Sequence, residues 1–259
     1  MIILDKNIDG RTINALAKNY NALDYSVKLS TSLKNVFPTE NFDNFSKYEL
    51  HKLLNDTLYQ YYKGEEILKY KLFQNYINKK NIIAAFEIKV NNSRLDFLTI
   101  NGRTTSFEIK SELDNLSKLG KQMADYMLAF EYNYLVIDQK HIEKAKKILP
   151  KSYGLWSYKN GKYKKLRKAL INEKIDSEIQ LSLLTKLELT KNFPNADGKI
   201  ENILNCLSAK DINRQFKKTL KNRYRNRWEF LITNKSEIFP MDIQFFFNTN
   251  IEPCHIYYH

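Results

Sequence analysis

Three ionisable residues, Asp96, Glu108 and Lys110, lie close together in the sequence on either side of the dipeptide Asn101-Gly102. The flanking segments alternate apolar and polar residues, as paired β-strands do, and Asn-Gly is typical of a tight type I′ turn in which both residues have positive φ. Such a hairpin places the two acids on neighbouring strands. Glu108 and Lys110 are two residues apart, so they project from one face of a strand. The sequence therefore predicts that two carboxylates and an amine converge.

Two carboxylates a few ångströms apart repel each other unless they share a cation. Oxygen ligands suit Mg²⁺ or Mn²⁺ rather than zinc, and the carbonyl of Ile109 is a further predicted ligand. Lys110 would position or deprotonate an attacking water and stabilise charge on a phosphate, while the metal lowers the pKa of that water. This chemistry is metal-assisted hydrolysis.

The same residues resemble the PD-(D/E)XK nuclease superfamily, whose core is an Asp, a hairpin and a Glu-x-Lys on the next strand. Leu95 stands where the pattern has Pro. Gln122 and Tyr126 match the Gln-x-x-x-Tyr motif of the RecB-like branch, and their i, i+4 spacing places both on one helical face. The resemblance is strong over residues 65 to 170. It implies that these two side chains orient the metal-bound water or the substrate phosphate.

The resemblance also implies a fold and an activity. The fold is an α/β, restriction-endonuclease-like mixed β-sheet flanked by helices, with a helical C-terminal module similar to the tail of an uncharacterised prokaryotic branch. The activity is hydrolysis of phosphodiester bonds with Mg²⁺ or Mn²⁺ as cofactor. The expected partner is nucleic acid, with DNA ahead of RNA.

Each motif also has an interpretation without function. A lone Glu-x-Lys is not specific, since Glu87-Ile88-Lys89 repeats it without a preceding Asp and hairpin. Glu66 begins a helix whose face continues through Phe73, so its carboxylate is a candidate metal ligand, as on this helix in some relatives. An acid favoured by the helix N-terminal dipole explains Glu66 equally well. The combined set, rather than any one residue, favours an active metal site.

The elements that would position these residues follow from hydrophobic periodicity. Helical spacing of apolar residues predicts helices in the first sixty residues and after Gly64. Period-two alternation predicts strands over 82–111, and helical spacing predicts another helix over 115–131. A strand at 134–138, a helix at 140–149 and a hairpin at 155–166 complete a mixed sheet. Helices follow from 174, and the aromatic last twenty residues could form a strand or an interface. We expect three parts: a helical cover at 1–63, the nuclease-like core at 64–172 and a helical basic module at 173–259.

Composition narrows the classes of protein. The 259 residues carry 42 Lys+Arg and 29 Asp+Glu, a net charge of +13, which favours a polyanionic partner, although a solvated Lys-rich surface would give the same count. The 2 Cys are far apart, which excludes a disulfide framework and fits a reducing cytoplasm. No stretch is apolar enough to span a bilayer.

The densest basic cluster of the predicted C-terminal module is interleaved with aromatics, a mixture that suits phosphate contacts with base stacking. A solvated amphipathic helix explains it nearly as well. The predicted nucleic-acid-binding residues are Arg214, Lys217, Lys218, Lys221, Arg223, Arg225, Arg227 and Trp228, with Tyr224 beside them.

The sequence supports three functions, which we give in decreasing order of support. The first is a metal-dependent nuclease acting on DNA. The second is a DNA-binding or scaffold module that keeps the nuclease fold without turnover, and the third is a toxin-like RNA nuclease.

Overall fold

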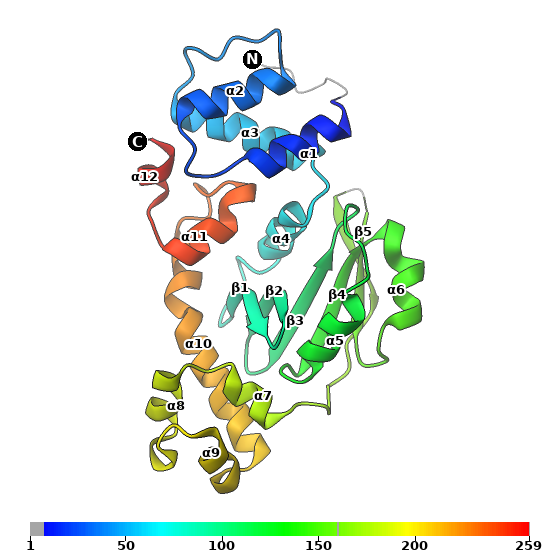
Figure 1. Cartoon of the computed structure of the whole chain (residues 1–259), viewed down its shortest axis with the longest axis vertical. Coiled ribbons are helices and arrows are strands. Elements are labelled where there is room, and N and C mark those ends of the chain that lie inside the picture. The colour runs from blue at the N-terminus through cyan, green and yellow to red at the C-terminus, as the bar shows by residue number, and fades with distance from the viewer. Residues whose placement is uncertain (1–7, 160, 259) are drawn as a thin grey trace. The chain divides into compact units, whose positions relative to one another are not determined.

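The structure is a computed structural model that describes residues 8–159 and 161–258. It divides into two compact units (Figure 1). The first unit combines Met1–Ile77 with Glu229–His259, and the second is Asn78–Trp228. This division differs from the predicted three parts, because residues 229–259 group with the first helices and residues 173–228 group with the sheet.

The first unit is helical. Its core contains Leu29, Leu33, Leu50 and Leu54, and Met241 from the C-terminal segment packs against it, which explains why the two ends of the chain belong together. Helix α3 begins with a capping box in which the Ser46 hydroxyl and the Glu49 carboxylate each accept a backbone N–H of the other's residue. The elements are α1 (Gly10–Asn19), α2 (Ser26–Val36), α3 (Lys47–Tyr61), α4 (Glu65–Gln74), η3 (Pro240–Asp242), α11 (Ile243–Thr249) and α12 (Pro253–Tyr257). The aromatic end of the chain is therefore helical rather than a strand.

The second unit contains a six-stranded mixed sheet in the order β1-β2-β3-β4-β5-β6. The first three strands are antiparallel, β4 is parallel to both β3 and β5, and β6 pairs antiparallel with β5. This is the predicted mixed α/β sheet. Its strands are β1 (Ile83–Val90), β2 (Ser93–Ile100), β3 (Thr104–Lys110), β4 (Tyr132–Asp138), β5 (Gly154–Lys159) and β6 (Lys162–Arg167).

The turn between β2 and β3 is not the predicted two-residue type I′ turn. Ile100 pairs with Thr104, so three residues connect the strands, and the amide of Asn101 donates to the carbonyl of Arg103 (3.0 Å). Of these three, only Gly102 adopts a positive φ, 69°. A three-residue loop with glycine in the left-handed region is a common hairpin connection, and it requires no strain at Asn101.

Helices cover the sheet of the second unit on both faces. Leu119 and Met123 of α5 and Ala145 of α6 form one apolar cluster with Leu135 and Ile137 of β4. The helices are α5 (Leu119–Met127), η1 (Gln139–His141), α6 (Ile142–Ile148), α7 (Ser177–Ser182), α8 (Lys186–Asn192), η2 (Pro194–Ala196), α9 (Ile200–Cys206) and α10 (Ala209–Thr233). Helix α5 begins later than the predicted 115, because the Asn115 side chain accepts hydrogen bonds from the Ser117 amide and hydroxyl and holds a turn there; the helix ends at Met127 rather than at 131.

An aromatic row covers the other face. The rings of Phe97, Phe107, Tyr134 and Trp156 lie 5.3 to 6.0 Å from their neighbours in the row, and Trp228 of α10 packs on Phe97 at 6.4 Å. Residues 97 and 107 alternate with 96 and 108, so α10 covers the face opposite to that of Glu108. Within the described ranges, no helix is long and apolar enough to cross a membrane.

Candidate metal and nucleic-acid site

The β2–β3 ladder ends at the pair Phe97 and Phe107, one residue short of Asp96 and Glu108. Beyond that point, the Asp96 side chain takes the place of a backbone acceptor, because its Oδ2 accepts the amide N–H of Ile109 at 2.6 Å. This charge-assisted bond fixes the Asp96 carboxylate between the two strands. The structure therefore brings Asp96 beside the Glu108-Ile109-Lys110 segment.

Glu108 and Lys110 point to one another from the same strand. The Lys110 ammonium donates to Glu108 Oε1 at 2.6 Å, and both residues are buried. Burial acts to lower the pKa of Lys110, but the charge of Glu108, its hydrogen bond and the charge of Asp96 outweigh burial and raise that pKa. The two acids and the amine lie close together, and the three-residue turn, which differs from the one predicted, sets the register that puts Asp96 and Glu108 on one face. Ile109 lies between them in the chain, and its carbonyl remains a predicted ligand.

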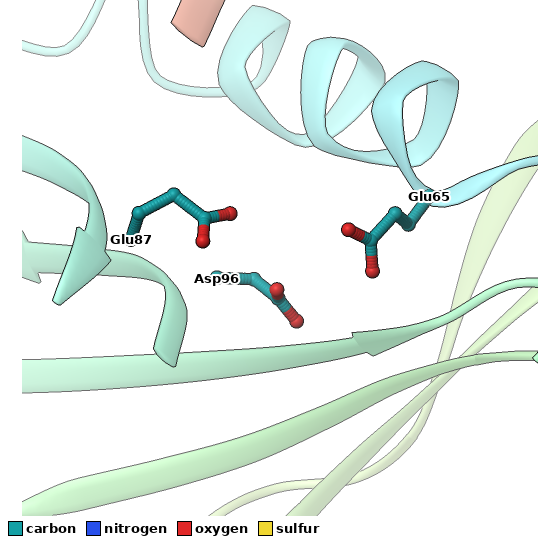
Figure 2. A group of neighbouring side chains, drawn as sticks. All are labelled: Glu65, Glu87 and Asp96. Atoms are coloured by element: carbon teal, nitrogen blue, oxygen red, sulfur yellow. The ribbon is translucent and has the colours of Figure 1, made fainter. Parts of the chain in front are cut away.

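Glu87 is an additional acid at this place. It stands opposite Asp96 by the β1–β2 register, but the ladder skips the pair, and Glu87 has a φ of 56° in the middle of a strand. A left-handed non-glycine residue costs about 1–3 kcal/mol and is concentrated at functional sites. Carboxylate oxygens of Glu87 and Asp96 lie within 4.8 Å of one another, and Figure 2 shows the two side chains next to each other. Glu87 also forms an ion pair with Arg94.

We call Glu87, Asp96, Glu108 and Lys110 the acidic site. The sequence left Glu87 undecided, because its Glu-Ile-Lys has no preceding Asp and hairpin. The signal that would have found it is the register itself, which places residue 87 opposite residue 96 once β1 is paired with β2.

Helix α5 contributes Tyr126 to the surroundings of the acidic site. Burial, followed by the charges of Glu108 and Asp96, raises the pKa of the Tyr126 hydroxyl, which places that hydroxyl near both acids and keeps it protonated. Gln122 lies one turn earlier, and its buried Oε1 has no hydrogen-bond partner among the described residues. Tyr153 is a neighbour that the sequence did not indicate: burial and the charge of Glu108 raise its pKa, and its hydroxyl donates to the Met123 carbonyl (3.0 Å).

Glu66 lies in the first turn of α4 and belongs to the first unit. Burial, with the charge of Glu65, raises the pKa of its carboxyl. Its role as a metal ligand remains a prediction.

The basic cluster on α10 differs from the predicted nucleic-acid surface in two respects. Trp228 is 3 % exposed and Tyr224 is buried, so both rings are core residues and are not available for base stacking. Lys217 pairs with Glu131 (2.7 Å), and the Arg223 Nε donates to Glu188 (2.7 Å), so both cations hold α10 in place. The amphipathic spacing of the aromatics is what a packed helix requires.

The remaining cations of the cluster are more accessible. Arg214 is exposed but pairs with Asp211 (2.7 Å), and Lys221 is half-buried. The other exposed members are Lys218, Arg225 and Arg227.

Comparison with known proteins assigns the family. Residues 55–246 match the family Bacteriophage P4 protein cII, and the chain belongs to this family. A comparison with curated proteins found no match. A solved structure of a protein of unknown function from Silicibacter pomeroyi is similar over 44% of this chain and 76% of its own, with 16% identity and a TM-score of 0.33.

Proposed function

We propose that this chain is a metal-dependent nuclease that hydrolyses phosphodiester bonds, with DNA as the first candidate substrate. The observation that carries the proposal is the convergence of Asp96, Glu108 and Lys110 where β2 and β3 separate. The family assignment is compatible with this activity and does not specify it.

The residues fit a hard divalent cation. Glu87 and Asp96 present carboxylate oxygens close together and largely shielded from water, where like charges repel strongly unless a cation lies between them. The donor atoms are oxygens, which suits Mg²⁺ or Mn²⁺. Bound there, the ion would lower the pKa of a water and offset charge on the scissile phosphate. Asp96 and Glu108 are the predicted ligands, with Glu87 as an additional acid.

The chain's own groups would provide the rest of the chemistry. Lys110 holds its proton because Glu108 lies against it, so it can donate to a phosphate oxygen or orient the attacking water. The Tyr126 hydroxyl is also protonated and is a second donor facing the acids. Gln122 Oε1 is a buried acceptor that can orient a water.

The alternative is a binding module that keeps the fold without turnover. The observation in its favour is that Asp96 Oδ2 and Glu108 Oε1 already have partners within the chain. A buried Lys–Glu pair also occurs as a structural ion pair. Activity assays separate the two functions.

The experiment incubates the protein with linear, circular and single-stranded DNA and with RNA, in Mg²⁺ or Mn²⁺, and compares Lys110→Ala with Lys89→Ala. Lys89 ends the second Glu-Ile-Lys of the chain and is exposed, so it is a matched control. We expect Lys110→Ala to reduce cleavage about 10²–10⁴-fold and Lys89→Ala to have little effect. Cleavage that survives Lys110→Ala would exclude this site. Absence of cleavage on every substrate favours the binding module, and cleavage of RNA alone favours the RNA nuclease.

A further inference from the structure

Positive charge is concentrated in one segment of the second unit. Residues 139–168 contain eleven Lys and Arg and a single acid, Glu143, which leaves a surplus of ten out of the chain's net +13. Glu143 forms an ion pair with Lys146 (2.7 Å). A surplus of this size within thirty residues creates a local field that attracts a polyanion.

Part of this segment lines an open groove of about 550 Å³ at the β5–β6 edge of the sheet. Lys159, Lys162 and Lys164 line it together with Ser157, and all three lysines are exposed. Ile142 of α6 and Leu166 contribute apolar surface. We call Ser157, Lys159, Lys162 and Lys164 the lysine groove.

The strand register connects the lysine groove with the acidic site. Lys110 pairs with Ile137, Ile137 with Ser157, and Ser157 with Lys164. Residues opposite one another in a sheet project from the same face, so Lys110 and Lys164 share a face of the sheet. Three strand spacings separate them, roughly 14 Å. A nucleic-acid strand in a duplex rises about 3.4 Å per residue, so this separation corresponds to roughly four nucleotides.

The predicted alternative, α10, lies on the other face. Its Trp228 packs on Phe97, and Phe97 belongs to the aromatic row opposite to Glu108. A strand bound along α10 would therefore lie against the wrong face of the sheet to reach Lys110.

Ile137, which lies between Lys110 and Lys164 on their face of the sheet, is buried under α5 and α6, so the route is the end of the sheet rather than its face. The parallel strands β3, β4 and β5 end at Lys110, Asp138 and Lys159, so the acidic site and the lysine groove lie at the same end of the sheet. The topology thus favours the lysine groove over α10.

We propose that the lysine groove holds the phosphodiester backbone of a nucleic acid whose scissile bond reaches the acidic site. The choice of nucleic acid, and of DNA in particular, rests on the proposed function. The contacts are lysine ammonium groups on phosphates, so binding is independent of sequence and depends strongly on salt.

Lysines on an edge strand have a second use, because they prevent one sheet from pairing with another. That use requires only a charge, of either sign. Phosphate binding requires a positive charge. Reversing the sign therefore separates the two roles without removing the protection of the edge.

The experiment measures binding of a labelled 20-bp DNA duplex by fluorescence anisotropy in EDTA, so that no cleavage occurs. The variant Lys159→Glu/Lys162→Glu/Lys164→Glu is compared with Lys186→Glu/Lys191→Glu/Lys199→Glu, which changes the net charge equally at exposed positions of the α8–α9 region. We expect the groove variant to raise Kd at least 10-fold more than the control and to reduce the slope of log Kd against log salt concentration by about 2–3. Circular dichroism checks that both variants are folded.

Equal effects of the two triple variants would overturn the proposal, since they would show a response to net charge alone. The proposal would also be overturned if Arg214→Glu/Lys218→Glu/Arg225→Glu on α10 raised Kd more than the groove variant does. Vesicles of phosphatidylglycerol test an anionic membrane surface as the alternative polyanion. If the groove variant loses vesicle binding but retains DNA binding, the groove binds a membrane surface and the proposal is overturned. RNA of the same sequence identifies the preferred nucleic acid. Because binding is measured without metal, a groove that binds DNA in a protein that cleaves nothing would leave this inference standing while the proposed function fails.

Discussion

Both units bury acidic groups, but the side chains that surround these groups differ. In the first unit, Asp242 Oδ2 accepts hydrogen bonds from the hydroxyls of Tyr20 and Tyr257, both at 2.8 Å, with Asn55 at 3.5 Å. Burial raises the pKa of Asp242 to about 7 despite these bonds. We call Asp242, Tyr20, Tyr257, Asn55 and His51 the polar network.

In the acidic site of the second unit, charged groups also face one another. Asp96 has Glu87 within 4.8 Å, and Glu108 has Lys110, in addition to the neutral Ile109 N–H that donates to Asp96. The left-handed φ of Glu87 adds backbone strain at the same place. A carboxyl group that accepts hydrogen bonds from several buried donors stabilises a fold, whereas clustered charge with strain decreases stability and is retained where it serves binding or chemistry. The difference is what we expect if the polar network is structural, and it supports the function proposed for the acidic site.

The largest expected effect comes from Asp96→Asn. The amide oxygen of Asn can still accept the Ile109 N–H, but the charge is lost. We expect cleavage to fall about 10²–10⁴-fold, the range for losing a group that acts in the transition state, while the free energy of unfolding stays the same or rises because a like-charge pair disappears. Titration with Mn²⁺ should show weaker binding than in the wild type. A variant that binds Mn²⁺ normally and cleaves normally would remove Asp96 from the site.

Asp242→Ala is the corresponding experiment in the first unit. It leaves the hydroxyls of Tyr20 and Tyr257 without their acceptor inside the core, and we expect a loss of about 3 kcal/mol in the free energy of unfolding. Hydrogen exchange should accelerate in α3 and α12 before it does so in the sheet. Cleavage per folded molecule should not change. Exchange that accelerates only in the sheet would contradict the structural role of the polar network.

Asp242→Asn serves as the control for that change, because it keeps an oxygen that can accept from the tyrosines. A smaller loss than with Ala is expected. Equal losses would show that the charge of Asp242, rather than its acceptor atoms, stabilises the unit.

Much of the acidic site could be predicted because its signals are local. Asp96, Glu108 and Lys110 lie within one hairpin, and alternation with a turn determines which side chains share a face. The turn type mattered, because a two-residue turn at Asn101 and Gly102 would have paired Ile100 with Arg103 and turned Asp96 to the face opposite Glu108. The three-residue loop pairs Ile100 with Thr104 instead, and this register continues to Asp96 and Glu108. The mixed sheet follows from the same period-two runs.

The features that could not be predicted depend on pairings distant in sequence. Trp228 contacts Phe97 from more than a hundred residues away, and nothing local distinguishes a ring that packs on a sheet from one that stacks on a base. Asp242 and Tyr20 are in contact although 222 residues separate them in the chain, so the grouping of both chain ends in one unit cannot be predicted from the sequence. The ion pairs of Lys217 and Arg223, which the sequence predicts as nucleic-acid-binding residues, could not be predicted because their partners, Glu131 and Glu188, lie on other elements.

The smallest expected effect is the pH dependence of the stability of the wild-type first unit, where two pKa shifts oppose each other. Asp242 has its pKa raised from 3.8 to about 7, so its contribution to stability is complete below pH 3.8 and is lost as pH rises through 7. His51, fully buried, has its pKa lowered from 6.5 to about 4, by burial first and then by the charge of Lys47. Its contribution is complete above pH 6.5 and is lost as pH falls through 4.

Between about pH 4 and 6.5 the two slopes, each about 1.4 kcal/mol per pH unit, have opposite signs and should cancel in the wild type. The hydroxyls of Tyr20 and Tyr257 stay protonated in this range because burial and Asp242 raise their pKa, so they do not disturb the balance. In Asp242→Asn only His51 titrates, so the free energy of unfolding should rise with pH. In His51→Gln only Asp242 titrates, so the free energy of unfolding should fall with pH. Urea unfolding at half-unit pH steps measures both slopes. If the free energy of unfolding has the same pH dependence in both variants, neither group titrates inside the core. The contrast between the polar network and the acidic site would then depend on the geometry of the acidic site alone.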